Sequence, residues 1–148
     1  MVMFNSLPQF DNVTEARKMF GFCRVLHDFA IKARREGILA LEEGLSENTG
    51  VYSGLSGMIW DFFKMLMRLV VDGTDTEVVR DCAKYMISTT NASDEVRLNM
   101  MIVAEGVISI QTGDNPRIML QKLTCMMGWD GRKECLKYLE AEGVDIED

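Results

Sequence analysis

The segment DEVRLNMMIVAEGVISIQTG, residues 94–113, decides the fold class of this chain. Apolar side chains recur in it every three or four residues, which is the spacing of one buried face of an α-helix. These side chains are Val96, Met100, Val103, Val107 and Ile110. Thr112 and Gly113 close the segment, because glycine readily adopts the left-handed conformation that ends many helices. We therefore predict a helix over residues 94–111.

Similar signals recur on both sides of this helix. Asn115-Pro116 predicts a new helix start, because asparagine caps free amides and proline suits the first helical position. Capping boxes, in which a polar cap precedes a glutamate by three residues, occur at Asn12 and at Thr74. Asp72-Gly73 is predicted to end a helix, and the polar residues 88–94 to form a turn between two antiparallel helices. Residues 44–57, rich in Gly, Ser and Asn, are predicted to form a loop.

Together these signals predict an all-α, single-domain bundle of about six helices. Their expected positions are residues 12–41, 58–71, 74–87, 94–111, 115–127 and 132–142. The buried side of the third helix is expected to carry Val78, Val79, Cys82, Tyr85 and Met86. A length of 148 residues with 47% apolar composition suits one domain spanning 1–148, with an acidic tail at 143–148.

The charge and hydropathy of the chain exclude several classes of partner. Sixteen basic and twenty-three acidic residues give a net charge of −7, which predicts no binding to nucleic acid. The two most apolar stretches are residues 54–71 and 98–110. Charged residues interrupt the first, and the second is too short for a membrane helix, so no membrane span is predicted. The first residues carry no basic start or long apolar run, which predicts a cytoplasmic location.

Residues suited to catalysis or cofactor binding are sparse. Four cysteines show no Cys-x-x-Cys pair, and the single histidine, His27, is predicted to point away from its neighbour Asp28 on a helix. No phosphate-binding or nucleophile motif is present, so we predict a protein that is not an enzyme and holds no cofactor or metal. Glu105 lies inside an apolar stretch, where a carboxylate is rarely buried unless it is paired. A surface position one helical face away from the core is the favoured interpretation.

Residues 33–43, ARREGILALEE, combine apolar and charged side chains at helical spacing. On one continuous helix, Arg34 and Glu42 lie roughly 12 Å apart along the axis and present opposite charges. Ile38 and Leu41 are expected to point inward between them. This pattern fits either a docking edge for a protein partner or an ordinary solvated helix face.

Four blocks of the sequence, in this order, resemble the cytoplasmic loop and C-terminal tail of MotA-type flagellar motor stator proteins. The blocks are ARREGILALEE (33–43), LVVDGTD with VRD (69–75 and 79–81), AEGVISIQ (104–111) and GDNPRI (113–118). The match extends over about residues 12–127. The resemblance implies that Arg34 and Glu42 occupy the positions at which family members meet the charged helix of the flagellar rotor.

The chain departs from the family pattern in its membrane helices. The family has one helix pair before the first block and another between the second and third, where this chain has only the turn at residues 88–94. The resemblance therefore implies a motility-associated protein that binds a rotor or other motor component and conducts no ions. The alternative is a non-catalytic scaffold or homo-oligomerisation module without rotor contact, which uses the Met-rich segments 58–67 and 119–127.

Overall fold

The structure, a computed structural model, describes residues 13–46 and 57–144. Its elements are α1 (Val13–Glu36), the 3-10 helix η2 (Ile38–Leu41), α2 (Glu42–Ser46), α3 (Met58–Val71), α4 (Thr76–Thr89), α5 (Asp94–Thr112), α6 (Pro116–Cys125) and α7 (Gly128–Ala141). The described residues contain no β-strand, which confirms the all-α class. Residues 13–46 and 57–144 form seven α-helices where about six were predicted for the chain, mainly because the first predicted helix is broken.

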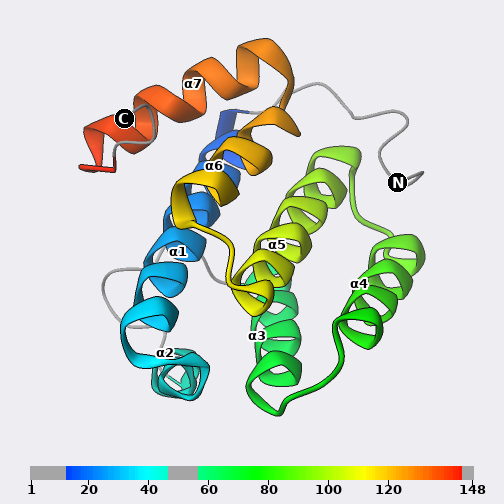
Figure 1. Ribbon diagram of the computed structural model, residues 1–148. Coiled ribbons are helices and arrows are strands. Elements are labelled where there is room, and N and C mark those ends of the chain that lie inside the picture. The colour runs from blue at the N-terminus through cyan, green and yellow to red at the C-terminus, as the bar shows by residue number, and fades with distance from the viewer. Residues whose placement is uncertain (1–12, 47–56, 145–148) are drawn as a thin grey trace.

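Helix α5 forms the centre of the bundle, where α1, α3, α4 and α6 pack around it (Figure 1). Apart from Met101, each residue from Leu98 to Ile110 is buried. The predicted helix is confirmed and ends at Thr112, where Gly113 takes φ 77° in the left-handed region. The apolar segment that decides the fold class is thus the segment that the other helices cover.

Helices α1 and α5 approach each other closely at Gly106. A Cβ atom added to this glycine would lie 2.5 Å from Cδ1 of Leu26 on α1, which is too close for a real contact. Leu26 is fully buried, so it has little room to move away. The missing side chain at residue 106 therefore lets Leu26 pack directly against the α5 backbone.

Glu105 is buried and not on the surface, which makes the favoured interpretation of this residue wrong. Nη1 of Arg80 on α4 donates a hydrogen bond to its Oε1 at 3.1 Å. Nζ of Lys122 on α6 lies 3.8 Å from its Oε2 and also 3.8 Å from Oδ2 of Asp114. A carboxylate in this position is stabilised because opposite charges from two other helices surround it. We call these four residues the Glu105 cluster.

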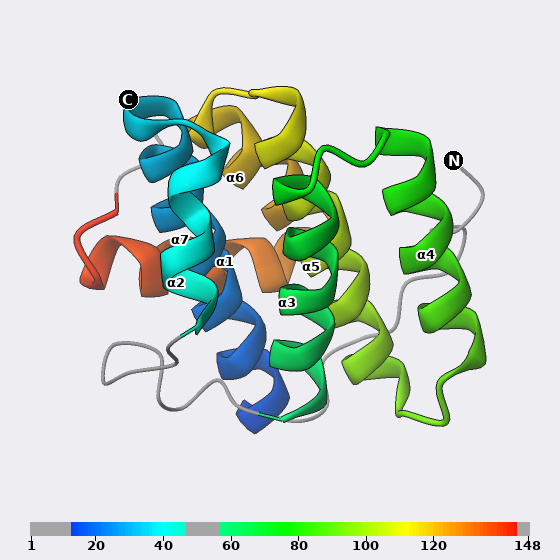
Figure 2. The ribbon, with the colours of Figure 1, turned by 90° about the horizontal axis from the view of Figure 1, so that it is seen from below.

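The first predicted helix ends five residues earlier than expected. Gly37 has φ 91°, outside the helical region, while its N–H still bonds the Ala33 carbonyl oxygen at 2.8 Å. The chain then turns back through η2, and α2 crosses the end of α1 (Figures 1 and 2). Residues 44–46 belong to α2 and not to the predicted loop, whose residues 47–56 lie outside the described part of the chain. The Asn12 cap also lies outside it.

The connection from α3 to α4 differs from the prediction in its capping residue. Gly73, with φ 80°, ends α3 as predicted, and the Thr74 N–H bonds the Leu69 carbonyl oxygen at 3.0 Å. Asp75, not Thr74, is the N-cap of α4, and its side chain makes no capping hydrogen bond. The predicted capping box at Thr74 is therefore wrong, because this residue completes the end of the preceding helix.

Helices α4 and α5 form the predicted antiparallel pair, joined by a short surface turn (Figure 2). The turn is shorter than residues 88–94, because α4 continues to Thr89 and Ser93 already caps α5. Oγ of Ser93 accepts a hydrogen bond from the Val96 N–H. The guanidinium of Arg97 donates to the carbonyl oxygens of Ile87, Thr90 and Ala92, so one side chain holds the whole connection.

The buried face of α4 is formed by residues other than most of those expected. Its buried residues are Val79, Ala83 and Ile87. Val78, Tyr85 and Met86 are 46%, 62% and 44% exposed, and Cys82 is half-buried. Helix α4 carries two apolar stripes, and the core covers only one of them.

The C-terminal helices follow the predicted order. Oδ1 of Asn115 accepts a hydrogen bond from the Arg117 N–H at 2.8 Å, which confirms the predicted cap of α6. Helix α7 begins at Gly128, four residues before the predicted start. On α1 and α7, Cys23 and Cys135 are fully buried. A hydrogen bond with Cys135, and then burial, raise the pKa of the Cys23 thiol well above its usual value.

Candidate protein-binding surface

The turn at Gly37 separates the two charged residues that the sequence places on one helix. Arg34 lies in the last turn of α1, and Glu42 begins α2. Both are exposed, as a docking residue requires. The expected separation along one helix axis is wrong, because the chain reverses between them (Figure 1).

Buried leucines hold this turn in place. Leu41 is fully buried and Leu45 is 2% exposed, while Ile38 is half-buried against the core. The inward position expected for Leu41 is confirmed, and that of Ile38 is confirmed in part. Gly44 lies against Phe29 of α1, where an added Cβ would come within 3.2 Å of the ring carbon Cζ. These contacts fix α2 against α1, so the charged side chains extend from a packed base.

Leu39 was not singled out from the sequence and is the apolar residue at the surface of this turn. Its side chain is 75% exposed, next to the half-buried Ile38. The exposed charged residues of the two helix ends on either side of it are Arg34, Arg35, Glu36, Glu42 and Glu43. We call Leu39 with these five residues the charged edge. Gly37 was the sequence feature that could have indicated the exposure of Leu39, because a break in the helix there changes which of the following residues face the core.

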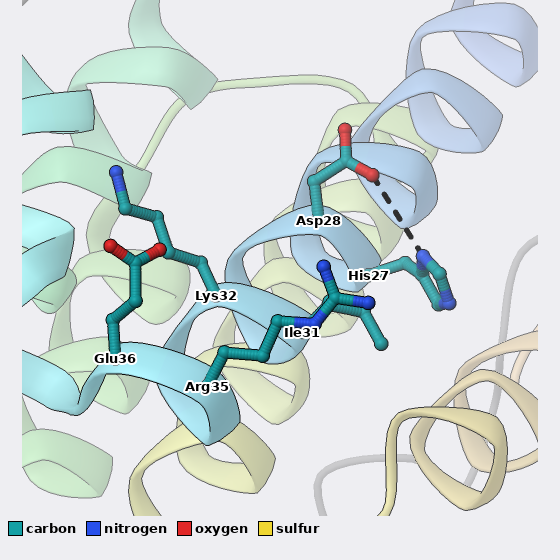
Figure 3. A pocket seen from close by; sticks show the side chains of 6 residues that line it. All are labelled: His27, Asp28, Ile31, Lys32, Arg35 and Glu36. Atoms are coloured by element: carbon teal, nitrogen blue, oxygen red, sulfur yellow. Dashed lines mark ion pairs between the residues drawn. The ribbon is translucent and has the colours of Figure 1, made fainter.

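A shallow, open hollow adjoins the charged edge on α1 (Figure 3). Its lining residues are His27, Asp28, Ile31, Lys32, Arg35 and Glu36, all from α1. Arg35 and Glu36 belong to both the hollow and the charged edge. The hollow and the charged edge therefore meet at two residues, so charges of both signs lie beside the hollow.

His27 and Asp28 lie closer together than their adjacent positions predict. Nδ1 of His27 is 3.8 Å from Oδ1 of Asp28, as the dashed line in Figure 3 marks. This distance exceeds that of a hydrogen bond, and Nδ1 of His27 has no hydrogen-bond partner. The pair therefore does not form the hydrogen-bonded acid–base couple that general base catalysis uses.

Residues 13–46 and 57–144 contain no group of three or more His, Cys, Asp or Glu side chains placed to hold a metal ion. None of the helices in these two stretches combines the length and apolar character that crossing a bilayer requires. Of the four cysteines, Cys23 and Cys135 are buried, Cys82 is half-buried and Cys125 is exposed.

The Met-rich segments of the alternative hypothesis contribute mostly to the protein's own core. Met67, Met119 and Met127 are buried, and Met65 and Met126 pack partly against the same core. Met58 is the exception in these segments, with 46% of its surface exposed. Little methionine surface remains there for a second protein.

Comparison with known proteins identifies no relative. No protein-family model, no curated protein and no solved structure matches this chain.

Proposed function

We propose that this protein is a MotA-like, non-catalytic interaction module of the flagellar motor that docks on a rotor or other motor component through the charged edge. The observation that carries the proposal is the exposure of Arg34 and Glu42 on either side of a packed turn, whose Leu39 is also exposed. The sequence block that holds both charges is the first of the four that resemble stator proteins.

The composition of the charged edge suits a protein interface. Interfaces commonly have an apolar centre surrounded by a polar rim, and a few central residues contribute most of the binding energy. The charged edge offers one exposed apolar side chain, Leu39, and charged side chains from the two neighbouring helix ends. Charges of both signs match a partner helix that carries the complementary pattern, which favours fast and specific association.

The proposal concerns docking and does not include ion conduction. In stator proteins, the parts that conduct ions belong to the membrane helices. At the place where the family inserts its second pair, this chain has the short turn held by Arg97. Arg34 and Glu42 are the residues carried over from the resemblance, and Leu39 is added because of its exposure.

The test is a binding titration against a purified flagellar rotor protein from the same cell, at low and high salt. Arg34→Glu and Glu42→Lys should each slow association and reduce its salt dependence, because the removed charges steer the encounter. Leu39→Ser should increase the dissociation rate. Glu134→Lys is a matched control, because Glu134 is an exposed glutamate on α7, away from the charged edge. Equal binding by wild type and all three edge variants contradicts the proposal, as does an absence of binding by wild type.

A further inference from the structure

Helices α1 and α7 bring two cysteine thiols together from distant parts of the chain. In both ribbon views α7 runs across α1, and the two helices pack against each other (Figures 1 and 2). Cys23 of α1 and Cys135 of α7 are both fully buried, and a hydrogen bond joins their side chains. The two residues are 112 positions apart in the sequence, so only the fold brings them into contact.

Contacts on both sides of the thiols fix the same crossing of the two helices. The ring of Phe20, about one helical turn before the thiol of α1, lies 5.9 Å from the ring of Tyr138, about one turn after the thiol of α7. Nη1 of Arg24, the residue that follows the thiol of α1, donates a hydrogen bond to Oε2 of Glu142 at 3.2 Å. The two thiols therefore lie between an aromatic contact and an ion pair that join the same helices.

The packing of α7 on α1 protects both thiols from oxidation. The thiolate, and not the thiol, is the nucleophile that attacks an oxidant. The hydrogen bond with Cys135, and then burial, hold the pKa of the Cys23 thiol well above its usual value, so this thiol stays protonated. Both residues are also inaccessible to solvent. Oxidation of either sulfur therefore requires that α7 first separates from α1.

Helix α7 is suited to such a local separation. Of its 14 residues only Gly131, Cys135 and Leu139 are buried, whereas α3, which has the same length, buries seven. An element that buries few side chains opens at a lower free energy than the whole protein unfolds. Once α7 separates from α1, water reaches both sulfurs, and burial no longer suppresses the formation of a thiolate.

We propose that Cys23 and Cys135 form a redox modification site, at which a hydroperoxide converts the two thiols into a disulfide that fastens α7 to α1. One thiolate attacks an oxygen of hydrogen peroxide, the O–O bond breaks, and a sulfenic acid and water form. The second thiol displaces the sulfenic oxygen, which leaves as water with the released proton. Each sulfur loses one electron, and the peroxide is reduced to two water molecules. The charged edge contains neither thiol, so this inference is independent of the proposed docking function.

The oxidation product tests the pairing. In the full chain with Cys82→Ser and Cys125→Ser, dilute hydrogen peroxide should remove both remaining thiols and lower the intact mass by two hydrogen atoms. A thiol reductant should reverse this change. Proteolysis without reductant should recover the fragments that contain Cys23 and Cys135 joined together. A matched variant that keeps Cys82 and Cys125 but carries Cys23→Ala and Cys135→Ala should form no internal disulfide. Oxidation that stops at sulfinic acid, with no joined fragments, overturns the proposal.

Thermal melts of the oxidised and reduced protein test whether the disulfide fits the native fold. The disulfide should raise the melting temperature by about 5–10 °C, because a bond between residues so far apart in the chain restricts the unfolded state. An equal or lower melting temperature of the oxidised protein would show that the bond distorts the contact between α1 and α7, which also overturns the proposal.

The rate of oxidation tests the separation of α7 from α1. Tyr138→Ala removes the ring contact with Phe20 and should accelerate disulfide formation at least about threefold, because α7 then separates more often. Lys137→Ala is the matched control, since Lys137 is the neighbouring residue, is exposed and pairs with Glu134 of its own helix. Its oxidation rate should equal that of wild type. An unchanged rate in Tyr138→Ala would show that the thiols react without separation of the helices, which overturns this step.

Discussion

The charged edge and the Glu105 cluster contain similar residues in opposite environments. Both contain carboxylates and basic side chains from elements that a turn connects. In the edge, Arg34, Leu39 and Glu42 are all exposed. In the cluster, Glu105 is buried, and ion pairs join it to α4 and α6.

Environment therefore decides what these charges can do. A surface ion pair contributes little to folding, because water solvates and salt screens both partners. A buried carboxylate that loses its partners has no comparable solvation, so its contacts hold helices together. The edge is available for recognition, while the cluster belongs to the architecture.

The largest expected effect comes from removing the central carboxylate. Glu105→Ala should lower the free energy of unfolding by about 2–3 kcal/mol, because it breaks the contacts among three helices. This loss is smaller than the loss expected for a fully buried ion pair, since the side chains of Arg80 and Lys122 remain partly solvated. Urea unfolding of Glu105→Ala beside Glu42→Ala measures the contrast between the two regions. Equal free energies of unfolding for the two variants would contradict the contrast between the Glu105 cluster and the charged edge.

A smaller loss of stability is expected for a substitution at the next residue of α5, Gly106. Gly106→Ala should cost about 1–2 kcal/mol, because the new methyl group overlaps Leu26. Combining it with Leu26→Ala should recover part of the loss relative to Leu26→Ala alone, since the cavity accommodates the methyl group. Additive losses in this double-mutant cycle would instead assign the cost of Gly106→Ala to another contact.

An intermediate case is the partly exposed lysine of the cluster. Lys122→Met should reduce stability by less than about 1 kcal/mol, because 42% of the lysine side chain is already in water. Thermal melts at two salt concentrations sharpen the comparison, since the difference between wild type and variant should shrink at high salt. A loss as large as that of Glu105→Ala would mean that Lys122 acts as a buried charge.

The smallest effects on folding are expected at the charged edge. Arg34→Glu and Glu42→Lys should each change the free energy of unfolding by no more than about 0.5 kcal/mol, since both residues are exposed. Urea titrations of the two variants and wild type measure this. A large decrease in the free energy of unfolding of either variant would show that the substituted residue helps to hold α1, η2 and α2 together.

Several features of the fold could be predicted because their signals are local. The end of α5 at Gly113 and the Asn115-Pro116 start of α6 depend on the preferences of neighbouring residues. The break at Gly37 is ambiguous, because glycine also occurs inside helices at a modest cost. The apolar residues on both sides of it continue the helical pattern, which hides the turn.

The remaining features depend on contacts between distant residues. The partners of Glu105 are 25 and 17 positions away, so its burial cannot be inferred from its own segment. On α4, two apolar stripes are equally suitable for the core, and only packing against α3 and α5 selects Val79, Ala83 and Ile87. The exposure of Leu39 could not be predicted for the same reason, because it depends on how η2 packs on α1.

The Arg97 contacts have a consequence for the kinetics of folding. They close a connection of four residues, so α4 and α5 can pair with little loss of chain entropy, whereas 57 residues separate the end of α1 at Glu36 from the start of α5 at Asp94. We therefore expect the α4–α5 hairpin to form before the transition state and α1 to dock after it. In stopped-flow experiments, Arg97→Met should then slow refolding, while Gly106→Ala should mainly accelerate unfolding. The reverse pattern would assign the folding nucleus to the α1–α5 contact.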